Sequence, residues 1–329
     1  MTRTAPVRIV RDSLLLGPVS VTFQRTLRIP ETGLHPLPPG LGRFPLRRVE
    51  DYPDTAPAGW LGRGGIMLPI YQREAMWLSF DSDEPTALQV GVGKVCAVSG
   101  LPWIERLIAD PQNYVALPRQ PWLDGINAGE GFIRQFVAVP LGSGATVEGQ
   151  VTGEESHGGI QLRTVGLTAE AREKWRAEQA AAQRELSDVE DCYDGLVMCA
   201  PPGAAMGLGA GGRMRQEVYA DNRPLADYDQ TGALRVFVHL CSAAQWTAIT
   251  GEVPPPTPVD RDAYVEAGLP WFDYYDADAS DLAASEVLSR VKSVGETLEI
   301  DDDPFVPVNP GTVIPIGGAS ADMVTDGTW

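Results

Sequence analysis

Residues 19–29 have the sequence VSVTFQRTLRI, in which apolar and polar residues alternate over part of the stretch. Such alternation is typical of a strand that turns one face toward a core. Residues 34–43 (LHPLPPGLGR) are rich in Pro and Gly, and we expect an extended surface segment there. Turn residues bound further short apolar segments, which we interpret as strands, at 65–70, 75–80, 88–98, 114–117, 132–139, 146–151 and 159–165. Residues 1–167 are therefore predicted to form a β-rich region.

The composition changes at residues 168–191, which are rich in Ala, Glu and Arg. Glu170 and Lys174 are spaced i,i+4, and large apolar residues are few, so the segment is predicted to be a mostly solvated connecting helix. A helix of this kind often links two parts of a protein. We therefore expect it to lie on the outside of the molecule.

Residues 192–300 mix the signals of strands and helices. The stretch 234–240 (LRVFVHL) is a predicted strand, and Ser242 with Gln245 forms a capping box for a helix that Gly251 ends. A final amphipathic helix is predicted from apolar residues at helical spacing, namely Ala284, Val287, Leu288 and Val291. The tail, 301–329, is acidic and then rich in Pro and Gly. The predicted fold class is α+β, with a β-rich N-terminal half packed against a mixed α/β C-terminal half in one compact unit.

The chain has 329 residues and a formal net charge of −18, from 44 acidic and 26 basic residues. Nucleic acid and anionic membrane surfaces would repel this charge, and no run of Lys or Arg compensates for it. No window holds the roughly 18 uncharged apolar residues of a spanning helix. We therefore expect a soluble cytoplasmic protein with no nucleic-acid or membrane partner.

The cysteines are too few and too scattered for a disulfide scaffold, and none has a zinc spacing. They are Cys96, Cys192, Cys199 and Cys241. We expect four free thiols, and we assign no metal and no cofactor.

A Pro-Trp-apolar-acid pattern occurs three times, at 102–105, 121–124 and 270–273. Proline and an acid suit the first turn of a helix, and the Trp would then anchor the turn in the core. Alternatively, Trp faces and carboxylates line a groove for a sugar or a cation. We favour the core interpretation, because Trp is usually highly buried. The candidate ligand-binding residues of the alternative are Trp103, Glu105, Trp122, Asp124, Trp271 and Asp273.

A glycine-rich stretch at 207–212 precedes two arginines. Glycine amides can cradle an anion, which makes candidates of Gly207, Gly209, Gly211, Gly212, Arg213 and Arg215. The stretch lacks the Lys-Ser/Thr of a phosphate loop and opens no clear helix. A plain loop is therefore favoured over a nucleotide site.

Two places carry candidate catalytic residues. His239 and Cys241 lie on one face of a predicted strand, where His could activate the thiol, although a buried strand face explains them as well. The stretch 148–159 (EGQVTGEESHGG) holds Glu148, Glu154 and His157 between two predicted strands. Paired carboxylates can perform acid–base chemistry, although a solvated hairpin connection also accounts for them. This second stretch is the leading catalytic candidate.

Four strings resemble a family of uncharacterised microbial proteins: PWLDGI at 121–126, VEGQVTGE at 147–154, MGLGAGGRMRQ at 206–216 and GLPWFDYYD at 268–276. The resemblance runs from about residue 20 to residue 295. It implies that the two halves belong to one unit, and it supplies no site residue.

We expect a structural or interaction protein without catalytic activity that self-associates or contacts another protein, because its loops are rich in proline and aromatic residues. The alternative is an enzyme or binding protein for a small polar ligand, sugar-like or cationic, built on the Trp–carboxylate turns and the 148–157 segment. A third hypothesis is an anion-binding module at 207–215.

Overall fold

The computed structural model describes residues 7–31, 33–129, 131–185, 206–256, 264–265, 267, 271–274, 281–283, 285–299 and 313–316. Its main sheet has seventeen strands: β1 (Arg8–Val10), β2 (Ser13–Leu16), β3 (Val19–Thr26), β4 (Leu34–His35), β5 (Gly40–Arg43), β6 (Arg47–Arg48), β7 (Ile66–Pro69), β8 (Ala75–Ser82), β9 (Thr86–Val92), β10 (Val95–Cys96), β11 (Val115–Leu117), β12 (Trp122–Leu123), β13 (Gly125–Gly129), β14 (Phe132–Pro140), β15 (Ile160–Gly166), β16 (Met206–Arg215) and β17 (Leu234–Cys241). Two further strands, β18 (Trp271–Tyr274) and β19 (Val313–Ile316), pair in parallel with each other.

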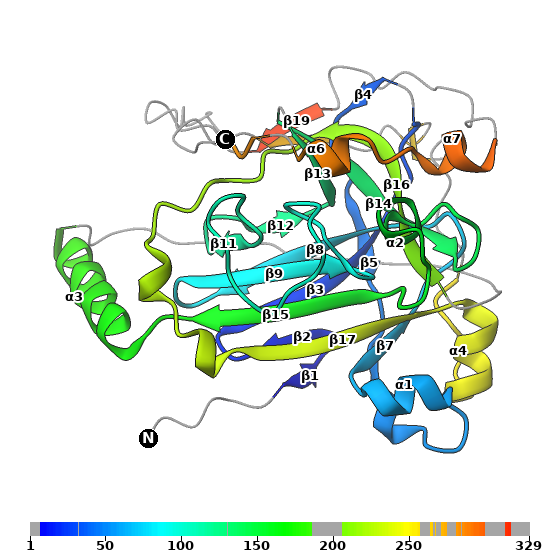
Figure 1. The fold of residues 1–329 in the computed structure, drawn as a ribbon, viewed down its shortest axis with the longest axis horizontal. Coiled ribbons are helices and arrows are strands. Elements are labelled where there is room, and N and C mark those ends of the chain that lie inside the picture. The colour runs from blue at the N-terminus through cyan, green and yellow to red at the C-terminus, as the bar shows by residue number, and fades with distance from the viewer. Residues whose placement is uncertain are drawn as a thin grey trace, which may run out of the picture.

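The helices of the described residues are short except for one. They are α1 (Ala58–Arg63), α2 (Val147–Thr152), α3 (Ala169–Glu185), α4 (Ala243–Thr250), α6 (Glu286–Ser289) and α7 (Val294–Leu298), with 3-10 turns η1 (Val49–Asp51), η2 (Leu225–Asp227) and η3 (Gln230–Gly232). None of them is long and apolar enough to cross a membrane. In Figure 1, α3 lies at one end of the sheet, and α1 and α4 lie together at the other.

The sheet is mostly antiparallel and draws strands from both halves of the chain. β3 pairs with β2 and β8, and β8 continues through β14 to β16. A second arm runs from β9 through β15 to β17, which then pairs in parallel with β7. The protein is therefore strand-rich and built on one large antiparallel sheet. The mixed α/β character of the C-terminal half stays a prediction, because much of that half lies outside the described residues.

The apolar residues of the stretch 19–29 are buried, as the sequence predicts. Val19, Val21 and Phe23 are fully buried. Ser20 and Gln24 keep some exposure, whereas Thr22, which lies between Val21 and Phe23, is also buried. These side chains share one apolar cluster with residues of β9, β15 and β17, such as Val90. Residues that are distant in the sequence bury the apolar face of β3, and this burial stabilises the strand that the sequence predicts.

One predicted strand is wrong: residues 146–151 form the start of helix α2. The Thr146 hydroxyl accepts a hydrogen bond from the Gly149 amide at 2.9 Å and caps the helix. Gly153 ends it in the left-handed region at φ 77°. Thr146 and Gly153 are local capping signals, and they prevail over the alternating pattern of the residues between them.

The other predicted helices are partly confirmed. Residues 169–185 are helical, Thr168 directly precedes the helix, and residues 186–191 of the predicted helix lie outside the described residues. Helix α4 begins at its Ser242 cap and ends at Gly251 as predicted. The final amphipathic helix is shorter than expected, since α6 covers only Glu286–Ser289.

Candidate functional site

A polar cavity lies beside strand β1, where two edges of the sheet approach each other. In the described part of the chain β1 pairs only with β2, and β17 pairs with β7 only from Val238 onward. Between β1, β6, the end of α1 and the first half of β17 lies a cavity of about 540 Å³. Its polar lining comprises Arg8, Arg48, Glu50, Arg63, Arg235, His157 and Gln161, and we call it the arginine cleft because four arginines face a single carboxylate there.

Arg63, the last residue of α1, is held in place at the cleft. Its guanidinium donates hydrogen bonds to the carbonyls of Ser156 and His157, each at 3.3 Å, and lies 5.4 Å from the Phe237 ring centre. Gly65 lets this corner of the chain approach β17, because a Cβ there would lie 2.1 Å from the Phe237 carbonyl oxygen. These contacts orient Arg63 without neutralising its charge.

The other three arginines differ in their partners. Arg48 forms ion pairs with Glu50 at 2.6 Å and with Asp51 at 2.5 Å, and Arg235 pairs with Glu105. Arg8 has no hydrogen-bonding or ion-pair partner within the described ranges. Because exposed ion pairs contribute little stability, all of these guanidinium groups can turn toward an anionic ligand.

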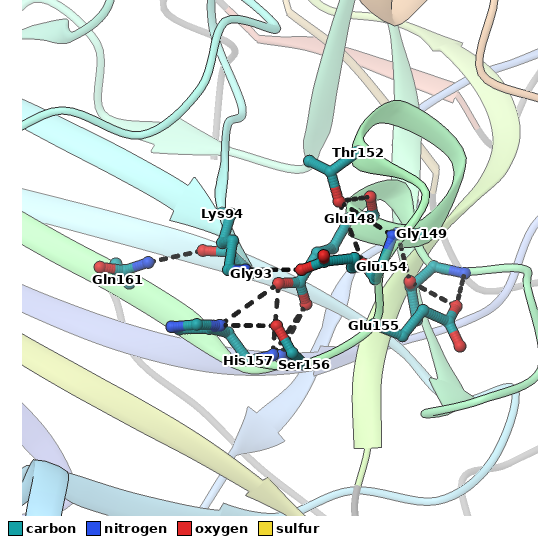
Figure 2. A network of polar contacts seen from close by, with 12 residues as sticks. Gly93, Lys94, Glu148, Gly149, Thr152, Glu154, Glu155, Ser156, His157 and Gln161 are labelled. Carbon is teal, nitrogen blue, oxygen red and sulfur yellow. Dashed lines mark hydrogen bonds and ion pairs between the residues drawn. The ribbon is translucent and has the colours of Figure 1, made fainter.

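Glu148 and His157, two of the candidate catalytic residues of the 148–159 stretch, lie together (Figure 2). The Glu148 carboxylate is 1% exposed and accepts hydrogen bonds from the amides of His157, at 3.2 Å, and Gly158, at 2.8 Å. The His157 Nδ1 lies 3.6 Å from Glu148 Oε1 and 3.1 Å from the Ser156 hydroxyl. Figure 2 shows the other ring nitrogen pointing away from Glu148, and His157 is part of the cleft lining.

The surroundings of His157 favour its neutral form. Burial and the nearby positive charge of Arg63 lower the pKa of His157, although the Glu148 charge opposes this. A neutral imidazole can donate or accept one hydrogen bond through its free nitrogen. Glu154, the third predicted residue, instead forms an exposed ion pair with Lys94 at 3.1 Å.

The three Trp–carboxylate segments lie in different places, and the prediction that they form first turns of helices is wrong, since Trp122 lies in β12, Trp271 lies in β18 and no helix covers residues 102–105. Trp271 is 1% exposed and packs edge-on against Tyr264, so it belongs to the core, and the side chain of Asp273 lies outside the described residues. Trp103 is half-buried, and its acid, Glu105, turns outward to Arg235. The second segment, at 121–124, lines a separate small pocket that neither Trp103 nor Trp271 reaches.

The glycine-rich stretch forms strand β16, not a loop. Gly207 and Gly209 pair with Val139 and Val137 of β14, so their backbone groups belong to the sheet instead of cradling an anion. A Cβ at Gly212 would lie 1.9 Å from the Pro30 carbonyl oxygen, which explains the need for glycine by close packing. The arginines that follow lie apart from the cleft lining: Arg213 stacks over Phe132 at 4.8 Å, and Arg215 is exposed.

His239 and Cys241 are both buried. The His239 ring stacks on Trp60 at 4.5 Å and its Nε2 lies 2.9 Å from the Gly64 carbonyl oxygen, while burial lowers its pKa to about 4. Cys241 is fully buried in an apolar cluster with Trp246, and burial raises its pKa. A buried thiol with a raised pKa is a poor nucleophile.

We expect Cys241 to be unreactive in the folded protein. Iodoacetamide at about pH 8 should modify it at least tenfold more slowly than an exposed thiol, because each unit of pKa elevation lowers the thiolate fraction tenfold. Peptide mass mapping before and after denaturation in urea measures this directly. Rapid alkylation of Cys241 in the native protein would contradict the buried assignment.

Comparison of the chain with protein-family models, curated proteins and solved structures finds no match. The described part of the chain also holds no group of three or more His, Cys, Asp or Glu side chains placed to bind a metal ion. The chemistry of the site must therefore be argued from its geometry. By that criterion the arginine cleft is the strongest candidate, although none of its arginines was predicted from the sequence.

Proposed function

We propose that this protein binds a small anionic ligand, carrying carboxylate or phosphate groups, in the arginine cleft. The observation that carries the proposal is the convergence of Arg8, Arg48, Arg63 and Arg235 on one cavity of about 540 Å³. That volume lies in the usual range for small-molecule sites. Arginine is the side chain best suited to planar, bidentate recognition of carboxylates and phosphates.

The surrounding charge supports a small ligand over a polymer. The whole chain has a net charge of −18, so an extended polyanion would meet repulsion outside the cleft. Within the cleft, Arg8 and Arg63 have no carboxylate partner among the described residues. Arg48 is paired with Glu50, which also lines the cleft, and Arg235 is paired with the exposed Glu105. A compact anion can therefore contact the two unpaired cations first and compete for the others.

His157 extends the set of ligand contacts. Its unoccupied ring nitrogen can hydrogen-bond a ligand oxygen, and the Glu148 carboxylate fixes the backbone on which it lies. If the protein were an enzyme, the same nitrogen would serve as its general base. The enzyme alternative would then use His157 of the 148–157 segment. Binding itself requires only the cleft.

A ligand panel tests the proposal. Pyrophosphate and citrate should raise the thermal unfolding temperature of the wild type, whereas neutral glucose at equal ionic strength should not. Arg63→Gln should weaken the affinity for the best anion about tenfold, because it removes charge-assisted hydrogen bonds. Isothermal titration calorimetry measures that change. An absence of binding to every anion of the panel would overturn the proposal.

Self-association and a cytoplasmic location remain predictions. Trp271 is buried and Trp103 and Trp122 are half-buried, so these three residues offer little aromatic surface to a partner. We therefore prefer ligand binding to self-association as the function, and we place the ligand in the arginine cleft instead of at the Trp–carboxylate segments.

A further inference from the structure

A second, separate pocket of about 180 Å³ lies over strands β8 and β12. Trp122 pairs with Ser79 across these strands, which places it diagonally beside Trp77 on the same face. The two ring centres are 6.2 Å apart and the ring planes are inclined by 60°, so the indoles form two walls that meet at an angle. Pro38 and Pro39 supply a third, apolar wall, and the lining shares no residue with the arginine cleft.

A nearly inaccessible carboxylate also lines this pocket. Asp124 is 3% exposed, and its Oδ2 accepts a hydrogen bond from Gln216 Nε2 at 2.8 Å. The Trp122 side chain hydrogen-bonds the same carboxyl group. No Lys, Arg or His forms an ion pair with Asp124 within the described ranges. Burial raises the pKa of Asp124 to about 7, as expected for a carboxylate that lacks a cation.

A second buried polar group in the pocket lacks a partner. The indole Nε1 of Trp77 is buried and has no hydrogen bond among the described residues. An uncompensated carboxyl group and an unsatisfied N–H beside an open pocket are costly in an isolated chain. A cation that fills the space lowers the cost of the Asp124 charge, whereas the Trp77 N–H is a donor and gains no partner from it.

We propose that this pocket, which we call the Trp corner (Pro38, Pro39, Trp77, Trp122 and Asp124), binds an alkylammonium group. Trp is the aromatic side chain that attracts cations most strongly, and aromatic walls are the usual site for quaternary ammonium ligands. The proline rings suit the methyl groups of such a cation, and Asp124 supplies the opposite charge. A quaternary ammonium needs no hydrogen-bond acceptors, so the scarcity of polar atoms in the lining is no obstacle. An anion would instead be repelled by Asp124.

Choline and its neutral isostere 3,3-dimethylbutan-1-ol form a matched pair of probes. They have nearly the same shape and differ in charge, so the difference between their affinities isolates the attraction of the Trp corner for a cation. At about pH 8 and constant ionic strength, we expect choline to bind at least about tenfold more tightly than the isostere. Tryptophan fluorescence and calorimetry report binding, and arginine-cleft variants should leave it unchanged.

Two variants locate the site. Asp124→Asn keeps a side chain that can hydrogen-bond Gln216 and removes the charge, so choline affinity should fall at least about tenfold toward that of the isostere. Asp81→Asn, an exposed carboxylate on β8, is the control and should bind like the wild type. If Asp124→Asn does not fold, Trp122→Phe should weaken choline binding instead. Equal binding of choline and the isostere, no binding of choline, or undiminished binding in a folded variant would overturn the proposal.

Discussion

Arg25→Met is expected to lower the free energy of unfolding by about 3–5 kcal/mol, because it leaves a buried carboxylate without its cation. Arg25 and Glu74 are 2% and 3% exposed, and Arg25 Nε donates to Glu74 Oε1 at 2.6 Å. Arg25 Nη2 also donates to the Pro256 carbonyl at 2.9 Å, which ties residues far apart in sequence. Loss of Arg25 therefore removes both a charge partner and a long-range tie.

Matched variants separate these effects. Arg25→Met/Glu74→Met removes both charges and should be considerably more stable than Arg25→Met alone, because two apolar side chains pack where the ion pair was. Arg48→Met breaks an exposed ion pair and should change stability little. Urea denaturation followed by circular dichroism gives the three values. Equal losses for the single and double variants would contradict a buried charge as the cause.

The loss for Arg25→Met should depend on pH. Burial already raises the pKa of Glu74, and Arg25 partly offsets this. Without Arg25, the pKa of Glu74 in the folded protein rises further above its pKa in the unfolded chain. Between these two pKa values the folded protein holds a proton on Glu74 that the unfolded chain has lost. Stability then falls as the pH rises from below the unfolded pKa to above the folded one. The destabilisation should therefore be larger near pH 8 than near pH 4.

Trp271→Ala is expected to cost about 3–5 kcal/mol of unfolding free energy through lost burial and the cavity it leaves. Trp271 is 1% exposed, belongs to the main apolar cluster and has its ring centre 5.9 Å from that of Tyr264. Trp271→Phe keeps an aromatic ring in the core and should cost clearly less. Urea denaturation measures both variants. A Trp271→Ala protein as stable as the wild type would show that this side chain is not a core anchor.

The sequence predicts the local elements well where burial and chain periodicity agree. Strand β3 follows its alternation, and α4 follows Ser242 and Gly251. It predicts them poorly where two local signals compete. Residues 147–151 alternate like a strand, yet their caps make a helix, and the glycines of β16 favour a loop until close contacts with β14 and Pro30 are known. Those contacts are long-range, and one sequence does not reveal them.

For the candidate site, the sequence indicates the proximity of some residues and not of others. Glu148 and His157 are nine residues apart, and their proximity follows from a short connection. The four arginines come from β1, β6, α1 and β17, and they lie far apart in the sequence of an acidic chain. No local pattern marks them, because only the pairing of strands brings them together. The Trp corner similarly depends on Trp77, which lies outside the repeated Pro-Trp pattern.

The central claim is that the arginine cleft binds an anion, and one calorimetric comparison tests it most directly. Pyrophosphate is titrated into the wild type, into Arg8→Gln/Arg63→Gln and into Arg213→Gln/Arg215→Gln at the same ionic strength. Both double variants lose two positive charges, but only the first loses them from the cleft. Binding should fall at least about a hundredfold in the cleft variant, from two charge-assisted contacts, and by far less in the control. Equal affinities for the two double variants would contradict the account.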